Sequence, residues 1–178
     1  MSDAPADPPQ LDVAAIVEAL NRHRVKYVVI GGVAGAAWAL SQGVDIPPTE
    51  DIDVTPEAGR ANLVRLSAAL KELDARVRSA AVPSGLPFDH DGESLAKGQI
   101  WNLICRHGPI DISIHPSGTG GYDDLADRAR VVTVQGIDTP LADLADIIRS
   151  KRAAGRPKDR LTLPQLEEAL RRRDAGTQ

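Results

Sequence analysis

The chain has 178 residues, of which 42% are hydrophobic and 26% charged, so it is long enough to bury the core of one ordinary globular domain. Aromatic residues make up only 3% and the formal net charge is −4. These values exclude a protein that coats nucleic acid through a uniformly basic surface and stacking aromatic rings. The arginines concentrate after Ala126, however, so a local contact with RNA stays open.

The only cysteine, Cys105, lies in an apolar run, which predicts a buried thiol rather than a disulfide or a zinc ligand. No apolar run approaches the roughly 18 residues that a membrane span needs, and no secretory signal pattern opens the chain. We therefore expect a cytoplasmic protein without a membrane partner.

Residues 1–10 contain three prolines and no apolar periodicity, so we predict a disordered lead-in followed by a single domain over residues 11–178. Apolar residues at helical spacing then predict a helix over 13–21, and the β-branched run 27–30 predicts a buried central strand.

Gly31 and Gly32 follow that strand and precede a predicted helix over residues 33–40. The N–H groups at the start of such a helix can bind an anion. A glycine pair at this position is also common for purely structural reasons, because glycine allows tight turns and close packing.

A loop over residues 41–50 leads to a second predicted strand, 51–54, in which alternation places Asp51 and Asp53 on one face. Two adjacent carboxylates repel each other unless a cation lies between them, and Mg²⁺ prefers such oxygen ligands. An Asp-x-Asp pair alone also fits a solvated strand face. Its place after a strand, a glycine pair and a helix favours the metal site.

The rest of the chain alternates between helical and extended patterns. We predict strands at 100–105 and 110–114, the second presenting Asp111, and interpret His90 as an ordinary loop histidine. Thr139 and Pro140 predict the start of a helix that ends near residue 152. The other expected elements are a helix at 57–73, an irregular segment at 82–97, a glycine-rich loop at 116–121, a short helix at 122–129, a strand at 131–134, a break at 154–159 and a last helix at 164–173.

The order of these motifs resembles the nucleotidyltransferase superfamily that includes DNA polymerase β. Residues 27–159 are more narrowly similar to the bacterial nucleotidyltransferases grouped with AbiEii abortive-infection toxins and with mycobacterial nucleotidyltransferase toxins. The likeness rests on Thr49 before Asp51, on the Asp111 strand followed by Pro116 and Gly118, and on the run 150–159. Pro47 departs from the pattern, since related proteins often have an arginine there.

The resemblance implies an α+β nucleotidyltransferase fold, with a mixed central β-sheet flanked by helices and with C-terminal helices over about 140–173. It implies that Asp51, Asp53 and Asp111 bind metal, with two Mg²⁺ ions expected, and that Asp111 helps to activate the acceptor hydroxyl. The implied ligands of the nucleoside triphosphate (NTP) are Gly31, Gly32, Thr49, Lys151 and Arg156, and Lys151 is also catalytic. Ser41 and Asp159 are implied as supporting residues, Asp159 through a salt bridge to Lys151 or Arg156.

The implied activity is Mg²⁺-dependent transfer of NMP from an NTP to an RNA, with the tRNA 3′ end preferred, or to a protein hydroxyl. In this hypothesis the protein is a monomeric toxin of a toxin–antitoxin or phage-defence system, with a cognate antitoxin as a candidate partner. Two alternatives stay open, namely a nucleotidyltransferase that modifies an antibiotic and an inactive nucleotide-binding interaction protein. The sequence does not choose among the four NTPs.

Overall fold

The computed structural model describes residues 9–176. Most of the predicted lead-in, residues 1–8, lies outside the described part, and so do residues 177–178. Pro9 and Gln10 are exposed and belong to no helix or strand.

A mixed seven-stranded sheet organises the described residues, with the strand order β3-β4-β5-β2-β1-β7-β6. The central strand β1 is antiparallel to β2 and parallel to β7, while β2 is parallel to β5. This arrangement confirms the predicted α+β class with a mixed sheet. The strands are β1 (Tyr27–Ile30), β2 (Ile52–Pro56), β3 (Arg76–Val77), β4 (Ile100–Cys105), β5 (Gly108–Ser113), β6 (Arg130–Val134) and β7 (Ile137–Leu141).

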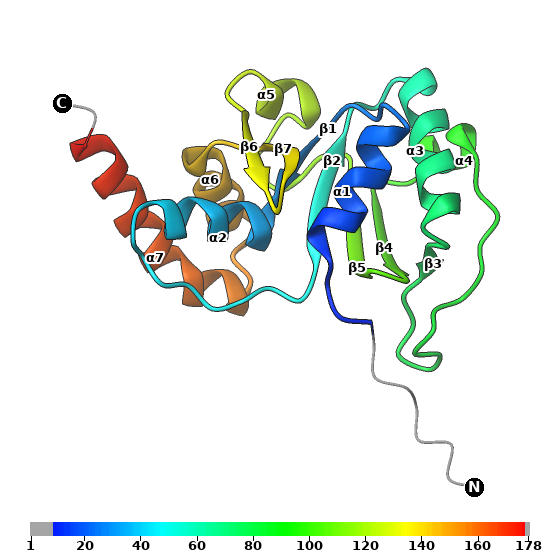
Figure 1. Ribbon diagram of the computed structural model, residues 1–178, viewed down its shortest axis with the longest axis horizontal. Helices are drawn as coiled ribbons and strands as arrows, with labels where there is room; N and C mark the ends of the chain where they lie inside the picture. The colour runs from blue at the N-terminus through cyan, green and yellow to red at the C-terminus, as the bar shows by residue number, and fades with distance from the viewer. Residues whose placement is uncertain (1–8, 177–178) are drawn as a thin grey trace, which may run out of the picture.

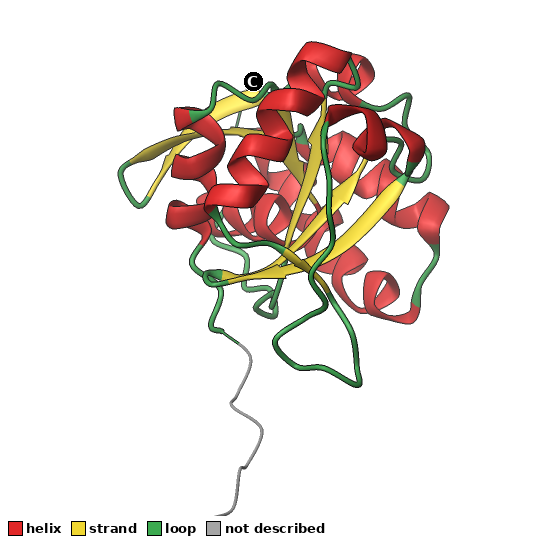
Figure 2. Ribbon diagram, turned by 90° about the vertical axis from the view of Figure 1, so that its right-hand side faces the viewer, coloured by secondary structure: helices red, strands yellow, loops and turns green. Residues whose placement is uncertain are grey.

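Helices cover both sides of the sheet, as Figure 2 shows. In Figure 1, α1, α3 and α4 lie beside β2 to β5, whereas α2, α6 and α7 form a group at the other end of the molecule. The helices are α1 (Val13–Arg22), α2 (Gly31–Ser41), α3 (Arg60–Glu72), α4 (Gly92–Lys97), α5 (Tyr122–Ala126), α6 (Leu144–Ala154) and α7 (Pro157–Ala175). None of the helices in the described range is long and apolar enough to cross a membrane.

The core is aliphatic, as the composition predicts. All four residues of β1 are buried, and α1 and α3 cover the sheet with leucine and isoleucine side chains. Cys105 is buried among them, as predicted. His90 is also buried: its Nδ1 lies 3.0 Å from Ser67 Oγ and its ring stacks on Phe88. His90 lies in a loop, as predicted, and tertiary packing buries it there.

The predicted helix start at Thr139 and Pro140 was wrong, because both residues belong to strand β7. Thr139 and Leu141 point inward and are buried. Pro140 lies opposite Val131 of β6, and the pairing of β7 with β1 is confined to Leu141. Helix α6 begins three residues later, where Asp143 accepts a hydrogen bond of 2.8 Å from Ala145 N.

Only two residues separate α6 from α7. Gly155 adopts a left-handed conformation (φ +61°) that ends α6, and Pro157 occupies the first turn of α7. The predicted break over 154–159 is therefore shorter than expected, and α7 begins at Pro157 rather than at Pro164, which lies inside the helix. Lys158 and Asp159 consequently face the site from a helix instead of a loop. The segment predicted as irregular at 82–97 likewise contains α4.

Candidate active site

Strand β1 passes directly into helix α2, which begins at Gly31. The glycine pair thus forms the first turn of the helix instead of a separate turn before it. Gly31 has a positive φ of +67°, and a Cβ at this position would overlap the carboxylate of Asp53. The free N–H groups and the positive end of α2 therefore lie next to the acidic residues.

The three predicted carboxylates come from two neighbouring parallel strands. Asp53 on β2 is in register with Asp111 on β5, and Asp51 precedes β2 on the same face as Asp53. Burial and the charges of Asp51 and Asp111 raise the pKa of Asp53 to about 6, although Lys158 and Arg156 act in the opposite direction. Burial also raises the pKa of Asp111. The site therefore concentrates negative charge.

The carboxylates suit Mg²⁺ chemically, since they are hard oxygen donors whose mutual repulsion a cation would relieve. Over residues 9–176, however, no group of three or more His, Cys, Asp or Glu side chains is arranged so that it could hold a metal ion. Asp51 and Asp53 fit the role by their position and charge, and Asp111 is already engaged by another partner.

That partner is Arg78, which the sequence analysis missed. Arg78 Nη2 donates to Asp111 Oδ1 at 2.5 Å and to the carbonyl of Leu103 at 3.2 Å. The two residues are 33 positions apart, and β4 lies between β3, which Arg78 follows, and β5, which carries Asp111. No local sequence pattern could have indicated this contact.

A cluster of cationic side chains comes from the junction of α6 and α7. Lys151 Nζ lies 3.1 Å from Asp159 Oδ1, and Arg156 Nε lies 2.7 Å from Asp159 Oδ2. Burial by itself would raise the pKa of Asp159, but the hydrogen bonds from Arg156 and Lys151 hold it below its ordinary value. The predicted salt bridges of Asp159 are therefore present, and this buried carboxylate holds both cations in place.

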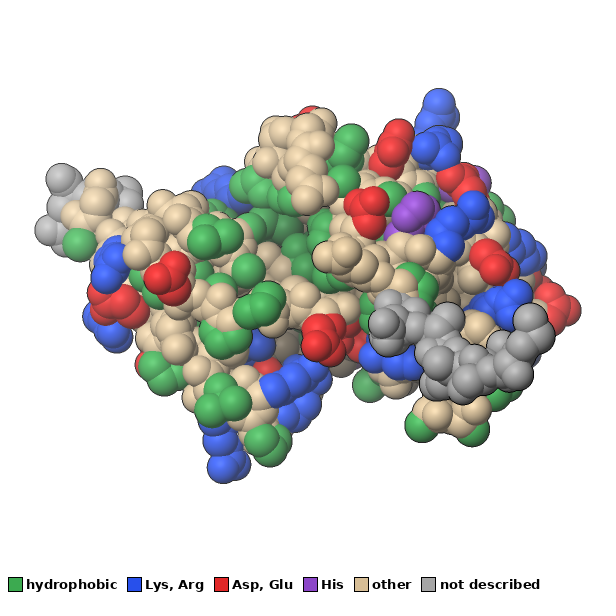
Figure 3. Space-filling view, turned by 60° about the horizontal axis from the view of Figure 1, so that its bottom comes forward, with side chains coloured by type: hydrophobic (Ala, Val, Ile, Leu, Met, Phe, Trp, Pro, Cys, Tyr) green, Lys and Arg blue, Asp and Glu red, His purple; other side chains and the backbone are tan. Residues whose placement is uncertain are grey.

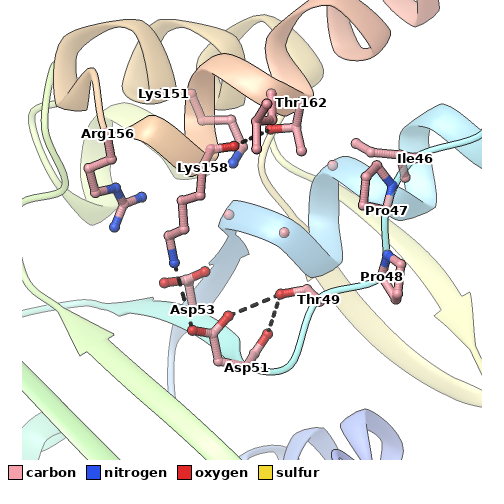
Figure 4. Close-up of a pocket in the computed structure, with 14 residues that line it drawn as sticks. Ile46, Pro47, Pro48, Thr49, Asp51, Asp53, Lys151, Arg156, Lys158 and Thr162 are labelled. Carbon is pink, nitrogen blue, oxygen red and sulfur yellow. Dashed lines mark hydrogen bonds and ion pairs between the residues drawn. The ribbon is translucent and has the colours of Figure 1, made fainter.

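Lys158 was not predicted as a site residue. Its Nζ lies 4.0 Å from Asp51 Oδ2, and Figure 4 shows its side chain pointing toward the two aspartates. The glycine followed by proline at positions 155 and 157 was a usable signal, because it marks the start of a helix whose first turn contains Lys158.

Two cavities meet at these residues. The first, of about 200 Å³, lies between α2, the loop before β2 and the start of α7. The second, of about 380 Å³, lies on the side of Asp111 and also contacts Pro116 and Ser117 from the glycine-rich loop. Both cavities are lined by Gly31, Asp53, Lys151 and Arg156. Near the middle of the face in Figure 3, basic side chains lie beside acidic ones.

The structure does not bring every predicted residue to the site. Ser41 lies at the opposite end of α2 from Gly31, where its hydroxyl donates to the carbonyl of Trp38, and it lines neither cavity. Thr49 lines the first cavity, but its hydroxyl donates to Asp51 Oδ1 at 3.0 Å. Thr49 therefore orients a carboxylate in this structure.

No protein-family model matches the chain, and neither does any curated protein. Among solved structures, the crystal structure of a candidate nucleotidyltransferase from Thermotoga maritima matches with a TM-score of 0.52 and 18% identity, over 79% of this chain and 81% of that one. The solution structure of the antibiotic-resistance factor ANT(2'')-Ia matches with a TM-score of 0.50 and 16% identity, over 91% of this chain and 90% of that one.

The chain has the nucleotidyltransferase fold. In this chain the glycine pair at the start of α2 faces the aspartates of β2 and β5, which agrees with what the sequence resemblance implies. The comparisons show the fold, whereas the likeness to the superfamily and the narrower likeness to AbiEii-like toxins rest on the sequence motifs.

Proposed function

We propose that this protein is a nucleotidyltransferase that moves an NMP group from an NTP to a hydroxyl. The observation that carries the proposal is the meeting of two cavities at Asp53, Lys151 and Arg156. A transfer between two substrates requires both of them to be held on either side of one reacting centre. The two cavities offer that arrangement.

The first cavity suits the NTP. The N-terminus of α2 and the side chains of Lys151, Arg156 and Lys158 all line it, and together they would bind the triphosphate. Arg156 can offer a forked contact, whereas the two lysines act as point charges. Asp159 keeps Lys151 and Arg156 oriented before the nucleotide binds.

Asp51 and Asp53 would hold divalent metal, and the resemblance adds Asp111 and a second Mg²⁺ ion, while in this structure Asp111 is paired with Arg78. When bound, the metal would stabilise negative charge on the phosphate and acceptor oxygens. Asp111 lines the second cavity, where it would accept the proton of the acceptor hydroxyl. Because Arg78 engages only Oδ1 of Asp111, the other oxygen is left for this role.

We propose an RNA, with the tRNA 3′ end preferred, or a protein hydroxyl as the acceptor, and a toxin role in a toxin–antitoxin or phage-defence system. This finer assignment is supported by the sequence resemblance. The acidic side chains that line the second cavity are Asp53 and Asp111, so a polycationic acceptor would have to compete with metal for them.

A second candidate is a nucleotidyltransferase that modifies an antibiotic. Two observations favour it: the fold is shared with an antibiotic-resistance factor, and Ile100, Ile112 and Ile147 give the second cavity an apolar part. Such a cavity could hold the ring system of a small acceptor.

Incubation of the purified protein with labelled NTPs, Mg²⁺ and total cellular RNA tests the central proposal. We expect label in RNA or protein with the wild type and none with Asp53→Asn. Asp127→Asn is the matched control, since Asp127 is exposed and lines neither cavity. Equal labelling by wild type and Asp53→Asn would refute the proposed active site.

Expression in a bacterial host separates the two candidate roles. A toxin arrests growth in an Asp53-dependent manner, whereas a resistance enzyme leaves growth intact and raises the inhibitory concentration of aminoglycosides or lincosamides. Purified protein with labelled NTP and these drugs gives the matching biochemical measurement.

A further inference from the structure

The first cavity has an apolar end that the phosphate-binding residues do not explain. Ile46, Pro47 and Pro48 line it from the loop before β2, and Leu161 lines it from α7. Among the described residues, Leu161 is the most exposed large apolar side chain, at 72%. We call these four residues the apolar clamp.

The apolar clamp is continuous with the cationic end of the same cavity. Leu161 and Thr162 follow Lys158 on α7 by three and four residues. One face of the helix therefore carries both the phosphate-facing cation and the apolar side chain. On the opposite wall, a Cβ on Gly32 would lie only 2.5 Å from Thr49 Oγ1, so the loop is packed against the first turn of α2. Figure 4 shows Ile46, Pro47 and Pro48 extending from this point.

The loop that carries three of the four clamp residues is fixed at both of its ends. Arg172 Nη1, near the end of α7, donates to the carbonyls of Gln42 at 3.2 Å and Gly43 at 3.0 Å. At the other end, the Thr49 hydroxyl donates to Asp51. The two prolines further restrict the backbone between these points. The clamp is therefore preorganised, which lowers the entropy lost when a flat ligand enters it.

We propose that the apolar clamp holds the nucleobase of the NTP by shape and apolar contact, without reading the hydrogen-bonding edge of the base. This inference rests on the proposed function, because it takes the cationic end of the cavity as the triphosphate site. The neighbouring side chains that carry a hydroxyl are Thr49 and Thr162. The Thr49 hydroxyl already donates to Asp51, and the Thr162 hydroxyl to backbone carbonyls of its own helix. The side chains of the clamp itself are aliphatic.

Weak discrimination among the four NTPs follows from this arrangement. Apolar contact distinguishes ligands by about 10- to 200-fold, whereas a site that hydrogen-bonds a polar group rejects ligands without it by about 10⁴-fold or more. We expect affinities for ATP, GTP, CTP and UTP that span less than about 100-fold, with the purines favoured because they offer more apolar surface.

Binding measurements on the full chain test the clamp separately from catalysis. The probes are each NTP and inorganic tripolyphosphate, in the presence of Mg²⁺, measured by calorimetry. Leu161→Gln keeps a good helix former at an exposed position, so the fold should persist. Leu40→Gln on α2 is the matched control, because Leu40 is 67% exposed and lines neither cavity.

We expect Leu161→Gln to weaken the binding of ATP about tenfold and to leave tripolyphosphate binding unchanged, with Leu40→Gln equal to wild type in both. Equal weakening of both probes, or no weakening of ATP, would overturn the clamp. A preference above about 100-fold for one NTP would overturn the claim that the clamp does not read the hydrogen-bonding edge of the base. Failure of wild type to bind either probe is a different pattern, and it would overturn the proposed function and the clamp together.

Discussion

Gly31, the first residue of α2, is in direct contact with Asp53: the carboxylate of Asp53 occupies the space that a Cβ on Gly31 would need. The helix start and the acidic strand therefore share one packed surface. This contact explains better than turn geometry alone why the helix begins with a glycine, because it lets free N–H groups and a carboxylate approach the same small volume.

Gly31→Ala should displace Asp53 and strain the backbone at φ +67°. We expect a loss of activity of at least about 100-fold, because misplacing a catalytic group by about 1 Å has effects of this size, together with about 1–3 kcal/mol of destabilisation. Nucleotidyl-transfer rates and denaturant unfolding measure the two effects.

Gly136→Ala is the control for Gly31→Ala. Gly136 also has a positive φ of +85°, but a Cβ there would meet nothing within 4 Å. This variant should be destabilised by the backbone strain alone and should keep its activity when folded. Comparable inactivation of both variants would show that the Asp53 contact is unimportant.

Replacing Asp53 with asparagine should stabilise the metal-free protein while it removes activity. The pKa of Asp53 is raised to about 6, so at pH 8 the folded state holds a charge that burial and the neighbouring aspartates disfavour. With EDTA at pH 8 we expect the melting temperature of Asp53→Asn to exceed that of the wild type by at least about 2 °C. Mg²⁺ should then raise the melting temperature of the wild type only.

The measurement for this pair is thermal unfolding with and without Mg²⁺, and Asp127→Asn again serves as the control. If Mg²⁺ raises the melting temperature of wild type and Asp53→Asn equally, metal binding lies elsewhere in the chain.

Asp159→Asn should destabilise the protein most at neutral pH. The folded-state pKa of Asp159 lies below its ordinary value, so its charge contributes stability above about pH 4 that is lost as the pH falls through the lower folded-state pKa. At pH 7 the variant leaves the buried Lys151 without its carboxylate partner, at an expected cost of about 3–5 kcal/mol.

Urea unfolding between pH 7 and pH 2.5 measures this dependence. We expect the curves of wild type and Asp159→Asn to converge toward the acid end. Glu168→Gln is the comparison, since Glu168 pairs with Arg171 and Arg172 on the surface and its removal should change stability little. A constant difference across the pH range would contradict the assigned role of Asp159.

Arg78→Gln should lower the turnover rate about tenfold or more without changing the KM for NTP. Arg78 orients Asp111 but does not line the first cavity, so donor binding should be unaffected. Steady-state kinetics with NTP as the varied substrate separate the two effects. Arg76→Gln is the control, because Arg76 pairs with Asp74 and lies away from Asp111. A rate above that of the wild type would instead identify the Arg78 contact as inhibitory.

The sequence by itself determined the parts of the site that local patterns encode. A buried strand followed by two glycines predicts a helix directly after them, although the helix itself begins at Gly31, and period-two alternation places Asp51 and Asp53 on one face. The same alternation exposes Asp111 on a strand whose isoleucines are buried, and the apolar run around Cys105 predicts its burial. These features depend only on the geometry of one strand or helix.

Only the tertiary structure decided how these parts meet. The register between β2 and β5 sets Asp53 against Asp111, and the path of β3 brings Arg78 to the same carboxylate. Packing of Thr139 and Leu141 turns a helix-start pattern into strand β7. The contacts join segments far apart in the chain, and their energies depend on register and packing, which the spacing of residues within one segment does not specify.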